Sequence, residues 1–203
     1  MPLLLVDMDD TLVDRAATVH RWMERRLGRG PHPRLARLVR RLHLHRLGAR
    51  LISLYERGEV RSYVLEEGVE EALTRVRRAG WSIAVITNGN ARTQPAKIAS
   101  ARIEPLVDGV VISGHEAFAK PDPRFFRLAA ERAGTDLEAA WVVGDDLGQE
   151  IRGAAKLGLR SVWLNPLGLP ANDDVDLQAA TFPEAVELVL SESPVRPRRP
   201  APS

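Results

Sequence analysis

The sequence predicts an α/β protein with a parallel sheet of about five strands, and three observations indicate this class. Short apolar runs, each the length of one strand, recur along residues 67–190 and alternate with helical patterns. The first run, at residues 3–6, is continuously apolar, which is typical of a strand buried on both faces. It ends abruptly in the carboxylates of Asp7, Asp9 and Asp10, so we expect the strand to open into a crevice.

A helix and a second strand are predicted between residues 67 and 87. The apolar side chains of residues 69–76 recur with the helical period, and Gly80 ends the helix. Residues 83–86 are again continuously apolar and predict a buried strand that stops at Thr87.

The third strand is predicted at residues 109–113, where glycine opens another apolar run. Asp122 can cap, and Pro123 can open, a helix that runs to about Ala133. The prolines on either side of Asp122 should present Lys120 at a fixed place, with the Lys120-Pro121 segment held extended.

The remaining core elements continue the alternation. They are a fourth strand at residues 140–143, a helix at 151–157, a fifth strand at 161–164 and a closing helix at 183–190. The fourth strand is followed by Gly144 and Asp145, another carboxylate at a strand end.

The composition is that of an ordinary soluble globular protein. With 203 residues, 44% hydrophobic and 28% charged, the chain can bury a sizeable core as one domain with an insertion. It contains no cysteine, which excludes a disulfide framework, a thiol nucleophile and a cysteine metal site. No apolar run approaches the roughly 18 residues of a membrane helix, and no basic leader opens the chain, so we expect a cytoplasmic protein.

Charge is distributed unevenly along the chain. Residues 15–66 hold 13 arginines and 4 glutamates, or +9, in three helical patterns, the first two separated by glycines and prolines. Residues 1–14 and 67–190 together hold 13 basic and 22 acidic residues, or −9. Residues 191–203 add three arginines and one glutamate, which gives the total of +2. This last segment is rich in proline and arginine with nothing to bury, so we expect a disordered basic tail.

The arginines of the insertion allow two interpretations. They form a solvated helix face whose aliphatic stems cover apolar surface, or they attract an anionic substrate toward the acidic core. Nucleic-acid binding is not favoured, because no recognition motif accompanies the charge. The carboxylates after the first strand also allow two interpretations. They form an acidic surface turn, or they form a site for a hard cation.

Four short motifs occur in order along the chain. They are Asp7-x-Asp9-x-Thr11-Leu12, Ile86-Thr87-Asn88-Gly89, Lys120-Pro121-Asp122-Pro123 and Val143-Gly144-Asp145-Asp146. Each is weak alone, but together they resemble the four motifs of the haloacid dehalogenase-like (HAD) hydrolase superfamily.

The resemblance covers roughly residues 1–165 and implies a Rossmann-like sheet in the order 3-2-1-4-5. It also implies a catalytic core at residues 1–14 and 67–190, with a small helical cap of the C1 type at residues 15–66. The order reverses between strands 1 and 4, where open α/β sheets bind ligands, and Asp7 and Asp145 follow those two strands.

The same resemblance implies a role for each motif residue. Asp7 is expected to be a nucleophile that forms an aspartyl-phosphate, and Asp9 a general acid and base. Thr87 and the Asn88 amide are expected to bind the transferring phosphoryl oxygens, and Lys120 to offset their charge.

The resemblance further implies a magnesium ion as cofactor. Its oxygen ligands would be the Asp7 carboxylate, the Asp9 backbone carbonyl and the Asp145 carboxylate. Where the family pattern has a further aspartate, this chain has Glu150, which keeps the charge but adds a methylene group. Glutamate there is expected to reach the metal through water, and it is not counted as a ligand.

The function implied by the resemblance is a Mg²⁺-dependent phosphatase acting on a small phosphorylated metabolite. An acid at position 9 favours phosphate-ester chemistry over dehalogenation, and Gln94 and Lys97 resemble a branch that holds nucleotidases and a sialic-acid phosphate phosphatase. Two alternatives stay open: a phosphomutase of the β-phosphoglucomutase type, and a non-catalytic binding module of the same fold. The substrate and the oligomeric state, monomer or dimer, are not predicted.

Overall fold

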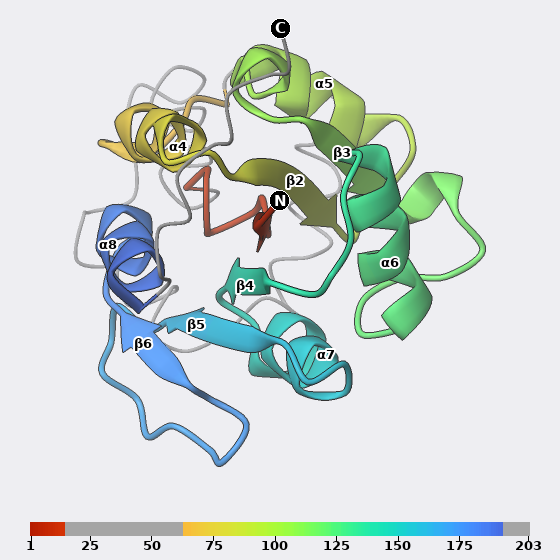
Figure 1. Ribbon diagram of the computed structural model, residues 1–203. Helices are drawn as coiled ribbons and strands as arrows, with labels where there is room; N and C mark the ends of the chain where they lie inside the picture. Colours follow the sequence, from red (N-terminus) through yellow and green to blue (C-terminus); the bar gives the residue numbers. More distant parts are fainter. Residues whose placement is uncertain (15–62, 193–203) are drawn as a thin grey trace, which may run out of the picture.

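The computed structural model describes residues 1–14 and 63–192 (Figure 1). The predicted helical cap lies outside the described residues except for its last four, residues 63–66. The predicted tail lies outside them except for residues 191–192, which continue the last helix.

All six strands of the structure form one parallel sheet, in the order β3-β2-β1-β4-β5-β6. The strands are β1 (Leu3–Val6), β2 (Ser82–Thr87), β3 (Gly109–Ile112), β4 (Ala140–Gly144), β5 (Arg160–Leu164) and β6 (Leu177–Ala179). The predicted Rossmann-like class and the order 3-2-1-4-5 are confirmed. Strand β6 was not predicted, because a three-residue strand at the sheet edge has no apolar run to mark it.

The register of the sheet places the ends of three strands side by side. Val6, the last residue of β1, pairs with Val85 of β2 on one side and Val143 of β4 on the other. The backbone N–H of Asp7 continues this ladder and donates to the Val143 carbonyl at 3.0 Å. Residues just beyond the three strand ends therefore meet at one edge of the sheet.

Helices cover both faces of the sheet. The α-helices are α4 (Val69–Arg78), α5 (Thr93–Ser100), α6 (Pro123–Arg132), α7 (Arg152–Ala155) and α8 (Phe182–Glu192). Helices α4 and α8 lie on one face, and α6 and α7 on the other (Figure 1). Side chains of β1 alternate between the two cores: Leu4 and Val6 pack toward α4 and α8, and Leu3 and Leu5 toward α6.

Short helical turns complete the fold. They are the 3₁₀ turns η2 (Glu104–Leu106) and η3 (Ser113–His115) and the π-helical turn η4 (Leu147–Ile151). The helix predicted at residues 151–157 therefore begins earlier, with a wider turn. Asp122 caps α6 as predicted, since its side chain accepts from the Arg124 N–H at 2.9 Å.

The expectation of an extended Lys120-Pro121 segment is wrong. Residues 119–122 form a turn, in which the Asp122 N–H donates to the Ala119 carbonyl at 2.8 Å. The Lys120–Pro121 peptide bond is cis. A residue before proline generally prefers extended backbone, but this preference does not distinguish a cis from a trans peptide bond at the proline.

Helix α5 was also not predicted, and its buried residues explain why. The side chains that it buries are Gln94, Lys97 and Ile98, so only one of its three buried residues is apolar. Among residues 1–14 and 63–192, no helix combines the length and apolar character needed to cross a membrane.

Candidate active site

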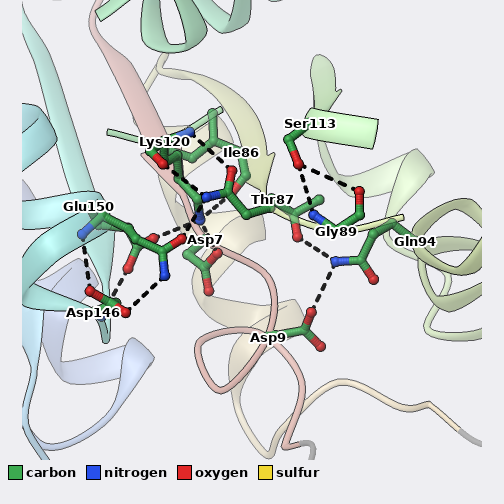
Figure 2. A network of polar contacts seen from close by, with 12 residues as sticks. Asp7, Asp9, Ile86, Thr87, Gly89, Gln94, Ser113, Lys120, Asp146 and Glu150 are labelled. Carbon is green, nitrogen blue, oxygen red and sulfur yellow. Dashed lines mark hydrogen bonds and ion pairs between the residues drawn. The ribbon is translucent and has the colours of Figure 1, made fainter. Parts of the chain in front are cut away.

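The sheet edge gathers the side chains that the sequence predicts to act together. Asp7 follows β1, Thr87 ends β2, and Asp145 follows β4. Lys120 reaches the same place from the turn before α6, and Asp9 lies in the loop after β1 (Figure 2). These residues come from four separate parts of the chain, and only the sheet order brings them together.

Lys120 is buried at the centre of this group, with 5% of its surface exposed. Its Nζ contacts Asp7 Oδ1, lies 2.7 Å from Glu150 Oε1 and donates to the Ile86 carbonyl at 3.0 Å. Burial acts to lower the pKa of Lys120, but the charges of Asp7 and Glu150 outweigh it and raise that pKa. The two carboxylates therefore favour the charged form of Lys120.

Asp7 is also buried, and its carboxylate faces Lys120. Burial raises the pKa of Asp7, and the nearby Lys120 opposes that rise. The contact with Lys120 thus supplies the charge compensation that an ionised carboxylate needs in a buried place.

Asn88 braces the Lys120 turn. Its side-chain carbonyl accepts from the Lys120 N–H at 3.0 Å, and its side-chain amide donates to the Lys120 carbonyl at 3.0 Å. The same amide donates to Gln149 Oε1 at 2.6 Å. These three contacts hold the Asn88 side chain against the Lys120 turn.

Asp9 is held from helix α5. Gln94 Nε2 donates to Asp9 Oδ2 at 3.0 Å and to Thr87 Oγ1 at 2.6 Å. Lys97 Nζ lies 3.1 Å and 3.3 Å from the two oxygens of the Asp9 carboxylate. The expectation for Gln94 and Lys97 rested only on their resemblance to one branch, and these contacts were not predicted. Their spacing of three residues, which places both on one helix face, was the available signal.

Glu150 is buried and lies next to Lys120. It is 1% exposed, and its two oxygens contact Lys120 Nζ and, at 2.9 Å, the Asp146 N–H. Burial raises the pKa of Glu150 to about 7, although Lys120 opposes the rise. Gly144 makes room for it, since a Cβ there would lie 2.4 Å from Glu150 Cγ.

Asp146 is likewise engaged in local structure. Its carboxylate accepts from the Gly148 and Gln149 N–H groups at 2.7 and 3.0 Å and so caps the turn η4. Its other oxygen accepts from Gln149 Nε2 at 2.9 Å.

The Asp145 carboxylate differs from its neighbours, because within the described part of the chain it forms no hydrogen bond or ion pair. Burial raises its pKa well above the usual range, and the charges of Asp7, Glu150 and Asp10 raise it further. In the described ranges no cluster of three or more histidine, cysteine or acidic side chains is arranged around a metal position. The predicted ligands, the Asp7 and Asp145 carboxylates and the Asp9 backbone carbonyl, are all oxygen donors, the kind that a hard cation such as Mg²⁺ prefers.

Comparison with known proteins gives relatives for most of the chain. The family model of the haloacid dehalogenase-like hydrolases matches residues 1–158. Phosphoserine phosphatase of Thermus thermophilus is 38% identical over 107 residues, which are 53% of this chain and 43% of that protein. Glyceraldehyde 3-phosphate phosphatase of Pyrococcus abyssi is 35% identical over 96 residues, which are 47% of this chain and 40% of that protein. The chain spans less than half the length of these two relatives.

A solved structure extends the likeness of fold. The HAD-hydrolase YfnB of Bacillus subtilis, solved bound to magnesium, superimposes with a TM-score of 0.72 at 19% identity. The alignment covers 93% of this chain and 98% of that one.

Proposed function

Because this chain belongs to the haloacid dehalogenase-like hydrolase family, we propose that it is a Mg²⁺-dependent phosphatase that hydrolyses a small phosphomonoester. The observation that carries the proposal is the buried contact between the Asp7 carboxylate and Lys120 Nζ, at the point where the sheet order reverses. A second acid, Asp9, follows in the loop after β1. Gln94 Nε2 donates a hydrogen bond both to Asp9 and to Thr87 and so links the two.

The reaction has two steps in which Asp7 is the nucleophile. In the first, an Asp7 carboxylate oxygen bonds to phosphorus, the ester P–O bond breaks, and the leaving oxygen takes a proton from Asp9. In the second, Asp9 takes a proton from water, whose oxygen bonds to phosphorus and releases inorganic phosphate and the free Asp7 carboxylate. One ester and one water become an alcohol and phosphate, and both aspartates return to their initial states.

Three groups are placed to bind the phosphoryl oxygens. The Thr87 hydroxyl and the Asn88 backbone N–H would donate hydrogen bonds, and Lys120 would supply positive charge. The Asn88 side chain supports this role indirectly, because it fixes the turn that carries Lys120. Such groups are effective when they are fixed before the substrate arrives.

The cation would be held by the carboxylates of Asp7 and Asp145 and by the Asp9 backbone carbonyl. When bound, Mg²⁺ supplies positive charge next to the transferring phosphoryl group. The Asp145 carboxylate supports this assignment, since it lies close to Asp7 and forms no hydrogen bond or ion pair with the other described residues.

The substrate class follows from chemistry and from two relatives. Two relatives, a phosphoserine phosphatase and a glyceraldehyde 3-phosphate phosphatase, are each named for a small phosphomonoester. An acid at position 9 suits the same class, because the oxygen of an alkyl phosphate leaves poorly unless it is protonated.

The proposal is tested by hydrolysis of 4-nitrophenyl phosphate with Mg²⁺ and with a chelator. We expect turnover that requires the metal, and Asp7→Asn should lower kcat by at least about three orders of magnitude. Asp173→Asn, which changes an exposed aspartate, is the matched control and should behave as wild type. A wild-type protein as inactive as Asp7→Asn on this compound and on a panel of phosphate esters would overturn the proposal.

A further inference from the structure

Lys97 is a buried lysine outside the four motifs. It is 2% exposed, and its ammonium group lies between the Asp9 carboxylate and the ring of Tyr63, whose centroid is 5.0 Å away. A buried ammonium group is costly unless it is paired, and a lysine at a helix surface can usually extend into water instead. The inward direction of Lys97 therefore needs an explanation beyond packing.

Gln94 lies one turn before Lys97 on α5, and its side chain points toward Asp9 and Thr87 (Figure 2). Its Nε2 donates to both Thr87 and Asp9, while its buried Oε1 has no partner among the described residues. An apolar residue would fill this position without leaving a buried oxygen unpaired. The amide donor is thus the part of Gln94 that the site uses.

The loop after β2 leaves room for this arrangement. A Cβ at Gly89 would lie 2.6 Å from Gln94 Cδ and 2.7 Å from Gln94 Nε2. A larger residue at position 89 would therefore displace the amide that bridges Asp9 and Thr87. Gln94 and Lys97 contact the Asp9 carboxylate, and Gly89 leaves the space that Gln94 needs to do so.

We propose that Gln94 and Lys97 are positioning residues that hold the Asp9 carboxylate beside Thr87, and so set how well Asp9 protonates the leaving oxygen. Gln94 bonds one Asp9 oxygen and the Thr87 hydroxyl through the same nitrogen, which fixes the carboxylate relative to the phosphoryl-binding group. Lys97 faces both Asp9 oxygens and restrains rotation of the carboxylate. Neither residue exchanges a proton in the reaction.

This inference rests on the proposed function, and it predicts a specific kinetic signature. Protonation matters most when the leaving group is poor, so a misplaced Asp9 should slow phenyl phosphate more than 4-nitrophenyl phosphate. The two compounds share a ring and differ mainly in how readily the oxygen leaves. A residue that only supports the fold would slow both equally.

The test compares Lys97→Met and Gln94→Leu with wild type on both aryl phosphates. We expect kcat/KM for phenyl phosphate to fall about tenfold more than kcat/KM for 4-nitrophenyl phosphate, because kcat/KM reports the step in which the leaving group departs. Asp9→Asn should show the same selectivity more strongly, and Lys97→Arg should recover most of the loss. Lys156→Met, at an exposed lysine, is the matched control. If Lys97→Met does not fold, Gln94→Leu provides the comparison.

Crystal structures of wild type and Lys97→Met supply a readout independent of turnover. We expect the Asp9 carboxylate to rotate away from its wild-type orientation in the variant. An Asp9 carboxylate in its wild-type orientation, or equal losses of kcat/KM on the two compounds, would overturn the inference and leave the phosphatase proposal standing. Absence of wild-type turnover would overturn the phosphatase proposal, and the crystal structures would still decide whether Lys97 positions Asp9.

Discussion

Lys120 and Glu150 form a buried ion pair next to the predicted nucleophile. Lys120 Nζ has two carboxylate neighbours, and Glu150 is the one that takes no proposed part in the chemistry. Its second oxygen accepts from the Asp146 N–H, so Glu150 is fixed at both ends of its carboxylate. It therefore holds the lysine at a defined distance from Asp7.

Glu150→Gln should weaken catalysis more than it disturbs the fold. Glutamine keeps the shape and an acceptor for the Asp146 N–H, but it removes the charge that faces Lys120. A small displacement of Lys120 is expected to lower kcat about tenfold with little change in KM. Steady-state kinetics on 4-nitrophenyl phosphate measures this, with the exposed Glu138→Gln as control. An unchanged kcat would mean that Asp7 and the Ile86 carbonyl suffice to place Lys120.

At the scale of elements, β5 supports the end of β4. Trp163 on β5 donates from its indole Nε1 to the Asp145 carbonyl at 2.9 Å. Trp163 is also buried, so the ring and the hydrogen bond both fix the backbone from which Asp145 extends. The position of a proposed metal ligand thus depends on a neighbouring strand.

Trp163→Phe should weaken the response to Mg²⁺. Phenylalanine keeps an aromatic ring but loses the donor, at a cost of about 1 kcal/mol, which corresponds to about a fivefold higher Mg²⁺ requirement. The measurement is the Mg²⁺ concentration for half-maximal activity. Trp141→Phe is the matched control, because Trp141 is equally buried, stacks on Arg160 and makes no indole hydrogen bond within the described residues. Equal shifts in the two variants would contradict the prediction.

Elements marked by an apolar run or by apolar periodicity were predictable from the sequence. Elements whose buried side chains are mostly polar were not. Strands β1, β2, β3, β4 and β5 follow the apolar runs, and α4 and α6 follow apolar periodicity and the Asp122 cap. Helix α5 escaped because its buried face holds Gln94 and Lys97. The turn η4 has a wider helical repeat, which a search for the ordinary helical period does not detect.

The candidate site was predictable to the same extent. Strand ends identified Asp7, Thr87 and Asp145, because carboxyl ends of parallel strands share one edge. Side-chain partnerships, such as Lys97 with Asp9, depend on distances across the fold that no local pattern carries. The contact of Glu150 with Lys120 was missed for the same reason.

At the scale of the whole molecule, the sheet order concentrates negative charge at one edge. The reversal between β1 and β4 brings Asp7 and Asp145 together, and Glu150 joins them. Lys120 faces Asp7 and Glu150, and Lys97 faces Asp9. A bound divalent cation would offset the negative charge that remains.

This charge imbalance links the stability of the fold to pH. The pKa values of Asp7, Asp145 and Glu150 are all raised, first of all by burial. A carboxyl group with a raised pKa stabilises the fold below its unfolded-state pKa, and that contribution is lost as pH rises through the folded-state pKa. For Glu150 this window runs from 4.5 to about 7.

Without metal, the stability of the fold should therefore decrease between pH 4.5 and about pH 7, and the thermal unfolding midpoint should fall with it. Mg²⁺ should reverse the fall at the higher pH, because a cation that binds only the folded protein adds about 2.7 kcal/mol at one hundred times its Kd. Thermal unfolding with chelator and with Mg²⁺ measures both effects.

Asp145→Asn removes one of the crowded carboxylates, so its metal-free midpoint should depend less on pH and should not rise with Mg²⁺. Asp173→Asn, which is exposed, should follow wild type in both respects. An equal Mg²⁺ response in Asp145→Asn and wild type would place the cation away from this edge of the sheet.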